Sequence, residues 1–428
     1  MRRRTRSSPV SGAWPARDAR VRWWRAAWLG LTLLMPALAG AQDAGTGPAV
    51  TLRTSLKGSL LAARSPSIDG AAADTTTTAF WRARLEPRVR IGPRVRFEFA
   101  YEHRAVTGAN RRGLTGLLSS DAPAPYRLRP LDWSVTTSPR LAWRHEVDRL
   151  ALAVTLPRAE ITLGRQAIGW GRGVLFGAVD LFAPFSPLEP DREWRRGVDA
   201  ARADIRITDR VSFDAVSAFG PSREASALAG RLRGYAGRID VEFLAGRRAR
   251  DGFAGVTSSA ALGDVEVHGE LAIFAPAQAT AFVPRAPVKA VVGGSSRVPL
   301  GQGVLVHLEY HYSGFGAARP GDIGARWGSE DGRTRYARGD AQVLGRHAIA
   351  VLATYEASPT LALGGHVLQS PRDGSGVVVP IVTLSLGDRW SIVTTGYLPH
   401  GQGPRGGVPR SEYGGAPRAL VLQARLYL

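Results

Sequence analysis

Residues 79–104 alternate between apolar and charged side chains, and this rhythm constrains the fold more than any other feature of the sequence. The pattern runs up to Ile91, stops at Gly92-Pro93-Arg94, and then resumes. A repeat of two residues is that of a β-strand with unlike faces, so the segment is predicted to be a β-hairpin. Its outer face is too long and too apolar for water, which indicates contact with lipid.

The pairing register of this hairpin follows from its charges, because residues that face each other across a ladder share one face of the sheet. A three-residue turn at 92–94 places Arg84 opposite Glu102. The next even register would instead oppose Glu86 with Glu98, which is less favourable. The charged face is predicted to point into a lumen, and its side chains are Arg82, Arg84, Arg88, Arg96, Glu98 and Glu102.

Similar strand-like segments recur along the chain, at residues 50–61, 159–165, 201–207, 211–219, 235–243, 265–274, 304–312, 349–355, 361–367, 377–386 and 390–398. Short turns alternate with long polar loops, of which the longest are 105–138, 313–343 and 399–417. The sequence therefore predicts an all-β fold, a single antiparallel transmembrane β-barrel. We expect about 16 strands, because single-chain bacterial barrels have even numbers of strands. The range is 14 to 18, because the alternation of short turns and long loops loses phase between 211 and 264.

The N-terminal segment resembles a secretory signal peptide. Several arginines precede an apolar run at 26–39, and Ala39-Gly40-Ala41 offers a small-residue cleavage site. The alternative is a membrane anchor, but 14 apolar residues interrupted by Pro36 are short for a membrane span. We predict cleavage near Ala41, a barrel over 42–428, and residence in the outer membrane of a double-membraned bacterium.

The last residues alternate again, with leucines at 420, 422, 426 and 428. This pattern resembles the terminal-strand signal by which outer-membrane barrels are recognised for insertion, so the barrel assembly machinery and outer-membrane lipid are expected partners. The alternative is an ordinary last strand of a soluble sheet.

Net charge is strongly positive, and part of it belongs to the leader. The chain has 56 basic and 36 acidic residues; without the eight arginines and one aspartate of residues 1–41, 48 and 35 remain, an excess of 13. Nucleic-acid binding would need arginines grouped on a solvent face, whereas here they alternate with apolar residues along strands. No nucleic-acid partner is expected, and a basic lumen favours anionic solutes. The chain has no cysteine, which excludes disulfides and thiolate metal sites.

Residues 159–199 form the one segment without a wall-like pattern. A strand leads into a glycine-rich stretch, then a proline-rich stretch, then a cluster of charges. An irregular insertion of this length is usually functional, and we predict that 166–199 folds inward as a loop or plug. Its charges would form the pore constriction, and the candidate residues are Arg165, Arg172, Asp180, Asp191, Arg192, Glu193, Arg195, Arg196 and Asp199. The alternative is a plug whose charges pair structurally.

This segment also resembles known proteins. Gly-Arg-Gln at 164–166, Trp-Gly at 170–171 and Asp-Leu-Phe-Ala-Pro at 180–184 are similar to a segment of bacterial outer-membrane barrels of the porin and alginate-export type. The resemblance covers roughly 40 of the 387 residues after the leader. It implies a barrel with a loop that folds inward and narrows the pore.

The histidines are candidates for metal binding and catalysis. His307, Glu309 and His311 share one strand face, which could hold a metal, but a solvated lumen wall is the preferred interpretation. No spacing assembles a histidine with a serine or aspartate into a catalytic set, because such groups would come from different strands. We expect no metal, no cofactor and no enzymatic activity.

These observations favour a porin-like channel that passes small hydrophilic solutes, preferentially anions, through an arginine-rich lumen. One alternative is an exporter or assembly barrel for an acidic polysaccharide or lipid, which a basic lumen would also serve. A barrel hydrolase is the second alternative.

Overall fold

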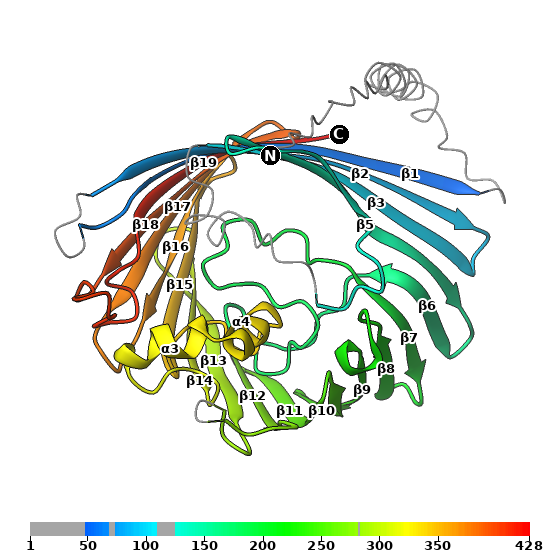
Figure 1. Ribbon diagram of the computed structural model, residues 1–428. Coiled ribbons are helices and arrows are strands. Elements are labelled where there is room, and N and C mark those ends of the chain that lie inside the picture. The colour runs from blue at the N-terminus through cyan, green and yellow to red at the C-terminus, as the bar shows by residue number, and fades with distance from the viewer. Residues whose placement is uncertain (1–47, 68–72, 109–124, 281–282) are drawn as a thin grey trace, which may run out of the picture.

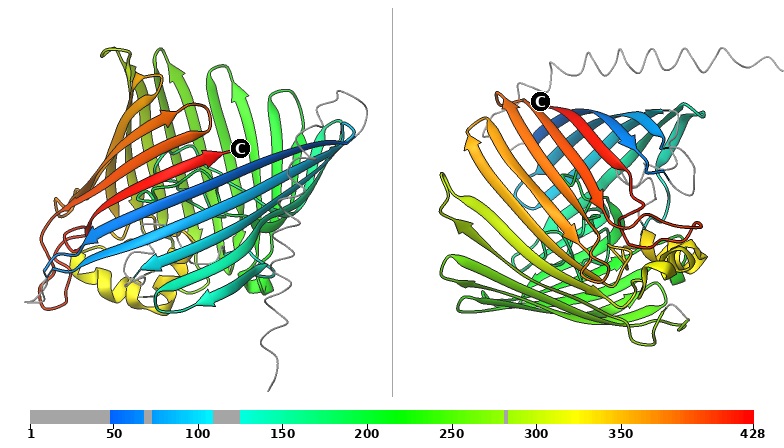
Figure 2. Two further views of the ribbon diagram at one scale, coloured as in Figure 1. Left: turned by 90° about the horizontal axis from the view of Figure 1, so that it is seen from above. Right: turned by 90° about the vertical axis from the view of Figure 1, so that its left-hand side faces the viewer.

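The alternating segments pair in chain order and close into a ring (Figures 1 and 2). The computed structural model describes residues 48–67, 73–108, 125–280 and 283–428, so the predicted signal peptide lies outside the described residues. Within them, nineteen strands form one sheet, and eighteen close the ring because β1 pairs with both β2 and β19. The predicted all-β antiparallel barrel is confirmed, with two strands more than the preferred 16.

The strands of the ring vary in length, from 8 residues in β6 and β8 to 17 residues in β2. Their bounds are β1 (Ala49–Arg64), β2 (Thr75–Ile91), β3 (Val95–Gly108), β5 (Leu141–Thr155), β6 (Ala159–Gln166), β7 (Val198–Arg206), β8 (Val211–Ala218), β9 (Ala227–Ala236), β10 (Ile239–Arg248), β11 (Asp251–Leu262), β12 (Val265–Ala275), β13 (Val288–Val298), β14 (Val304–Ser313), β15 (His347–Ser358), β16 (Leu361–Gln369), β17 (Gly376–Leu386), β18 (Trp390–His400) and β19 (Arg418–Tyr427).

The predicted register of the first hairpin is confirmed. In the β2–β3 ladder Arg84 lies opposite Glu102 and Arg88 opposite Glu98, around the turn at 92–94. Gly92 has φ +60°, a conformation that glycine adopts without strain. Charge alternation therefore determined both the strands and how they pair.

One predicted strand, at 235–243, is wrong. The structure has a turn at Gly237-Arg238, so this range joins the end of β9 to the first half of β10. The turn is only two residues long, and the alternation runs through it without a break. β11 and β13 were not predicted because they are rich in small residues, so their two faces differ little in polarity.

The nineteenth strand, β4 (Asp132–Thr137), fills a gap in the wall. It pairs with the part of β5 that lies beyond the end of β6, where the chain leaves the sheet at Gln166. β4 lies within the predicted loop 105–138, so that loop contributes to the sheet.

Short helices lie in two of the long connections. They are η1 (Arg223–Ala225), η2 (Pro320–Asp322), α3 (Ile323–Gly328) and α4 (Glu330–Ala337). The last three belong to the predicted loop 313–343 and lie at the end of the ring shown toward the viewer in Figure 1. In the described part of the chain, no helix has the length and apolar character needed to cross a bilayer.

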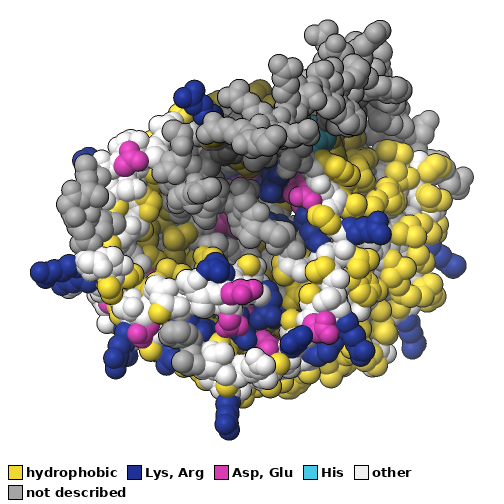
Figure 3. All heavy atoms as spheres, in the orientation of Figure 1, with side chains coloured by type: hydrophobic (Ala, Val, Ile, Leu, Met, Phe, Trp, Pro, Cys, Tyr) yellow, Lys and Arg dark blue, Asp and Glu magenta, His cyan; other side chains and the backbone are white. Residues whose placement is uncertain are grey.

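The two faces of the wall differ in character. Large apolar side chains such as Leu163, Phe243 and Leu422 are about half exposed, on the outside of the ring. In Figure 3 hydrophobic side chains cover the visible flank, and charged side chains of both signs surround the mouth. The main hydrophobic core lies inside the ring, between the 168–183 segment and the strands around β8–β12.

Candidate functional site

The chain between β6 and β7 runs through the interior of the ring in Figure 1. Its amides are held by side chains of the barrel wall. Glu270 on β12 accepts hydrogen bonds from the backbone N–H groups of Gly173 (2.9 Å), Ala178 (2.6 Å) and Val179 (3.2 Å), and from that of Arg172.

A second carboxylate, Glu309 on β14, holds the amides in between. It accepts from Leu175 N (3.0 Å) and Phe176 N (3.1 Å) and from Val174 N. Gln342 accepts from Gly177 N at 2.8 Å. Eight consecutive backbone N–H groups, 172–179, are therefore satisfied by three side chains from elsewhere in the fold. Buried amides need such partners, so this arrangement fixes the path of the segment.

Two glycines make this path possible. Gly171 has φ +116°, and a Cβ atom there would lie 2.9 Å from the Glu270 carboxylate. At Gly173 a Cβ atom would lie 2.0 Å from the carbonyl oxygen of Phe176. The glycine-rich composition thus serves close approach between the backbone and the carboxylate.

The other end of the segment is bound to the opposite wall. Lys57 on β1 contacts Asp191 at 2.7 Å and Glu193 at 2.5 Å, and its Nζ lies 3.8 Å from the centre of the Trp194 ring. In the ring of eighteen strands β12 is nine positions from β2, the neighbour of β1. The segment is therefore anchored on opposite sides of the barrel.

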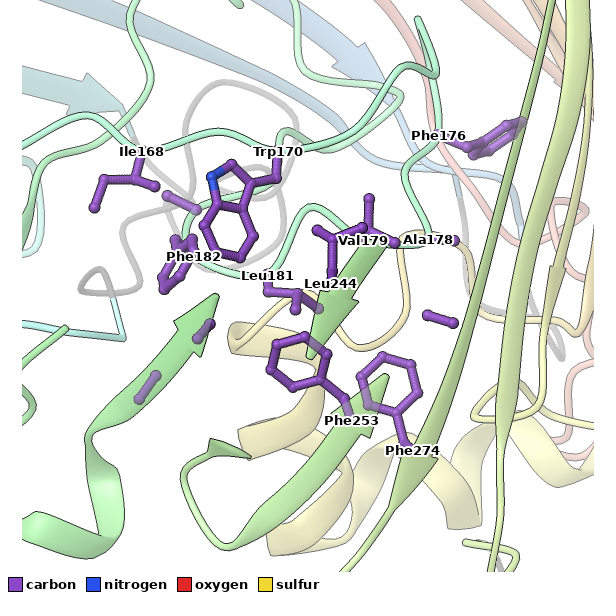
Figure 4. Close-up of a cluster of buried hydrophobic side chains, with 14 of the residues drawn as sticks. Ile168, Trp170, Phe176, Ala178, Val179, Leu181, Phe182, Leu244, Phe253 and Phe274 are labelled. Carbon is purple, nitrogen blue, oxygen red and sulfur yellow. The ribbon is translucent and has the colours of Figure 1, made fainter. Parts of the chain in front are cut away.

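Apolar packing reinforces the polar anchors. Trp170, Leu181 and Phe182 of the segment are at most 2% exposed and pack with Leu244, Phe253 and Phe274 of the wall (Figure 4). Trp170 also donates from Nε1 to Asp214 on β8 at 3.1 Å. Packing of this density opposes free movement of the 168–183 region.

Five of the predicted constriction residues lie on the inner segment in paired arrangements. Arg195 donates to Asp180 at 2.5 Å, and burial raises the pKa of the Asp180 carboxyl despite that neighbour. Arg172 contacts Asp240 and, at 3.0 Å, Glu242, both on β10. Asp191 and Glu193 share Lys57, as described above.

Arg192 differs from these residues. Arg192 donates to the carbonyl oxygen of Val174 at 2.9 Å and lies 5.4 Å from the centre of the Phe185 ring, and it forms no ion pair with any described residue. Burial lowers the pKa of Arg192, and lowers that of Arg196 to about 10. Both guanidinium groups remain charged at neutral pH.

Arg165 and Asp199 lie apart from the other seven. They pair with each other at 2.7 Å across the β6–β7 ladder, and Arg165 also donates to the carbonyl oxygens of Val147 and Arg129. Val198 and Ala200 are buried inside the ring, so alternation turns Asp199 toward the other face. This pair fastens the chain before β4 to the ends of β6 and β7.

The predicted lumen-facing residues form two groups. Arg82, Arg84 and Glu102 belong to a buried network that includes Arg104 and Asp148. Nearer the short turns, Arg96 contacts Glu98 and Glu160, both at 3.1 Å, and Arg88 lies opposite Glu98 in the ladder.

The described residues line cavities in the interior and at the mouth of the barrel. One of about 350 Å³ is lined by the inner segment, including Gly169, Asp180, Arg192 and Arg195. A larger one of about 1140 Å³ lies among the long loops, and a small one of about 20 Å³ lies near Trp194. Arg196 lines both of these last two, at the boundary between the mouth and the interior.

The histidine cluster is part of the wall. Glu309 of the predicted His307, Glu309 and His311 set accepts backbone amides, and the ring of His311 stacks on Phe176 with centres 4.8 Å apart. Nearby, Ser295 donates its hydroxyl to Glu266, which also contacts His268 Nδ1 at 3.2 Å. The serine reaches the carboxylate rather than the imidazole, which differs from a nucleophile–base pair.

A closed antiparallel wall with an apolar outside and a charged inside defines the class, an outer-membrane β-barrel. No protein-family model matches the sequence, and no curated protein matches it. Solved structures match the fold of the chain. OccAB1 of Acinetobacter baumannii has a TM-score of 0.54 at 9% identity, over 91% of this chain and 98% of that one.

OccK7 (OpdD) of Pseudomonas aeruginosa has a TM-score of 0.54 at 8% identity, over 89% of this chain and 98% of that one. OccAB4 of A. baumannii has 0.52 at 7% identity, over 90% and 99%. These proteins are outer-membrane porins, and at such low identity the similarity concerns the fold. The chain has the porin-like β-barrel fold.

Proposed function

We propose that this protein is an outer-membrane channel that passes small hydrophilic solutes and favours anions. The observation that carries the proposal is the inner segment, which is anchored at Glu270 and Glu309 on one side and at Lys57 on the other. A fixed bridge across a lumen narrows the passage beside it without requiring a gate to move. Segment 166–199 then acts as the constriction.

The proposed anion preference rests on Arg192. Most guanidinium groups inside the barrel are neutralised by neighbouring carboxylates, as Arg84 and Arg172 are. Arg192 lines the 350 Å³ cavity without an ion pair among the described residues. Rings or pairs of uncompensated charge select ions by sign.

The bridge also separates the alternatives. An exporter of an acidic polysaccharide needs a wide, continuous conduit, whereas a chain anchored on opposite walls divides the lumen. A structural plug would have the same anchors but no conductance, so transport measurements distinguish it from a constriction.

Liposome swelling tests the proposal. Vesicles containing purified protein should swell fastest in a sugar acid, more slowly in a neutral sugar of the same size, and slowest in an amino sugar. Swelling in none of the three would indicate a plug, and fastest entry of the amino sugar would contradict the anion preference. We further propose that residues 1–41 are removed on export and that the assembly machinery inserts the barrel; N-terminal sequencing of outer-membrane protein tests the cleavage near Ala41.

A further inference from the structure

A row of exposed arginines without ion pairs to described residues lies at the end of the barrel where the short turns are. Eight short turns join the strands there, and four consecutive ones, from β2–β3 to β9–β10, each contain an arginine. These residues are Arg94, Arg158, Arg210 and Arg238, and all four are exposed. None of their guanidinium groups forms an ion pair with a residue that the structure describes.

The other four turns differ in charge. Between β11 and β18 the turns contain one arginine, Arg389, and two aspartates, Asp264 and Asp388. The first four turns contain four arginines and one aspartate, Asp209, for a net charge of +3; the last four have −1. A general richness in arginine would affect both halves alike, so the asymmetry needs another explanation.

Each arginine turn also carries a large exposed apolar side chain within three positions of the arginine. These side chains are Ile91, Leu156, Ile207 and Ile239, with exposed fractions of 57%, 43%, 50% and 48%. A guanidinium beside an exposed apolar group fits the boundary between acyl chains and headgroups, because each finds its preferred surroundings there. A soluble acidic partner would provide no such surroundings for the isoleucines.

We propose that this basic arc, Arg94, Arg158, Arg210 and Arg238, binds the phosphate groups of anionic phospholipids in the periplasmic leaflet of the outer membrane. Short turns face the periplasm in such barrels. Guanidinium groups bind phosphate with paired, charge-assisted hydrogen bonds. Turns two strands apart are separated by roughly 10 Å, which lets each arginine engage a different headgroup. The arc holds one side of the barrel to the leaflet.

Native mass spectrometry of the full mature protein, released from nanodiscs with equal phosphatidylglycerol and phosphatidylcholine, tests this inference. Each arginine should favour the anionic lipid by on the order of fivefold. In the variant R94Q/R158Q/R210Q/R238Q the ratio of retained phosphatidylglycerol to phosphatidylcholine should fall by about tenfold or more. Heat-modifiable migration on gels verifies folding, and the single variant R158Q serves if the quadruple variant does not fold.

A matched control removes four exposed arginines from the opposite end, as R64Q/R140Q/R405Q/R410Q. The control loses the same net charge and should keep the wild-type lipid ratio. An equal fall in the lipid ratio in both variants would mean that net charge alone causes the preference, and would overturn the proposal. An unchanged lipid ratio in the arc variant would overturn it too. An unchanged lipid ratio with weakened binding of polyglutamate would assign the arc to an acidic polypeptide and also overturn it.

Discussion

Glu270 is the side chain on which the position of the inner segment most depends. Its two oxygens accept four backbone N–H groups from the segment. Hydrogen bonds to a charged group contribute about 1.5–3 kcal/mol each. Glu270→Gln retains one acceptor oxygen and points an amide NH₂ at the remaining donors, so about half of the bonds are lost. The free energy that holds the segment should fall by about 3–6 kcal/mol.

The consequence is a larger population of channels with a displaced segment. Each 1.4 kcal/mol changes a population about tenfold, so displacement should become at least about a hundredfold more frequent. Planar-bilayer recordings should show a larger mean conductance and more open-channel noise, and trypsin should cleave after Arg172 sooner than in the wild type.

Glu266→Gln is the matched control. Glu266 lies four residues before Glu270 on the same face of β12, and its partners are His268 and Ser295, neither of which belongs to the segment. Conductance, noise and cleavage should stay at wild-type values. If Glu270→Gln behaves like Glu266→Gln, the carboxylate does not fix the segment and the reasoning fails.

Three further predictions follow from individual residues. Arg192→Gln should shift the reversal potential in a salt gradient toward the value expected for cation permeation. Arg165→Gln, with the same charge change outside the constriction, should leave the reversal potential unchanged. Equal shifts would contradict the role of Arg192 in the constriction. Gly173→Ala should lower the free energy of unfolding by about 2 kcal/mol or more, because its Cβ meets the Phe176 carbonyl oxygen. Gly234→Ala, whose Cβ meets nothing within 4 Å, should lower the free energy of unfolding by less. Calorimetry compares the two variants. Burial raises the pKa of Glu412 from 4.5 to about 7, so its contribution to stability is complete below pH 4.5 and lost as pH rises through 7. Glu412→Gln should remove the fall in the thermal unfolding midpoint between pH 4.5 and 7. Glu330→Gln, at an exposed position, should leave that fall unchanged.

Sequence patterns predicted the barrel and one register because charge alternation on β2 and β3 is strong and the turn at 92–94 is unmistakable. The same reasoning failed at Gly237-Arg238, where the alternation passes through a two-residue turn without changing phase. Contrast between the two faces, rather than strand length, decides what can be predicted.

The predicted site was limited by a different factor. The segment itself was recognisable from its irregular composition, but the carboxylates that hold it were not. Glu270 and Glu309 look in the sequence like any other acid on an inward-facing strand position, such as Glu266 or Glu98. Which of them accepts backbone amides depends on the path of a chain about 100 residues away, and no local pattern encodes that.

Arg165 and Asp199 differ from the other candidate constriction residues. Their position at the two ends of the irregular segment suggested a place in the constriction, whereas the structure pairs them across the β6–β7 ladder. Strand alternation could have separated them, because Arg165 shares a face with the outward-facing Leu163.

The current through purified protein in a planar bilayer, measured across a potassium chloride gradient, shows whether the barrel is an anion-preferring channel. We expect discrete channel openings and a reversal potential of the sign that chloride permeation gives. A silent bilayer containing folded barrels, or a reversal potential of the sign that potassium gives, would contradict it.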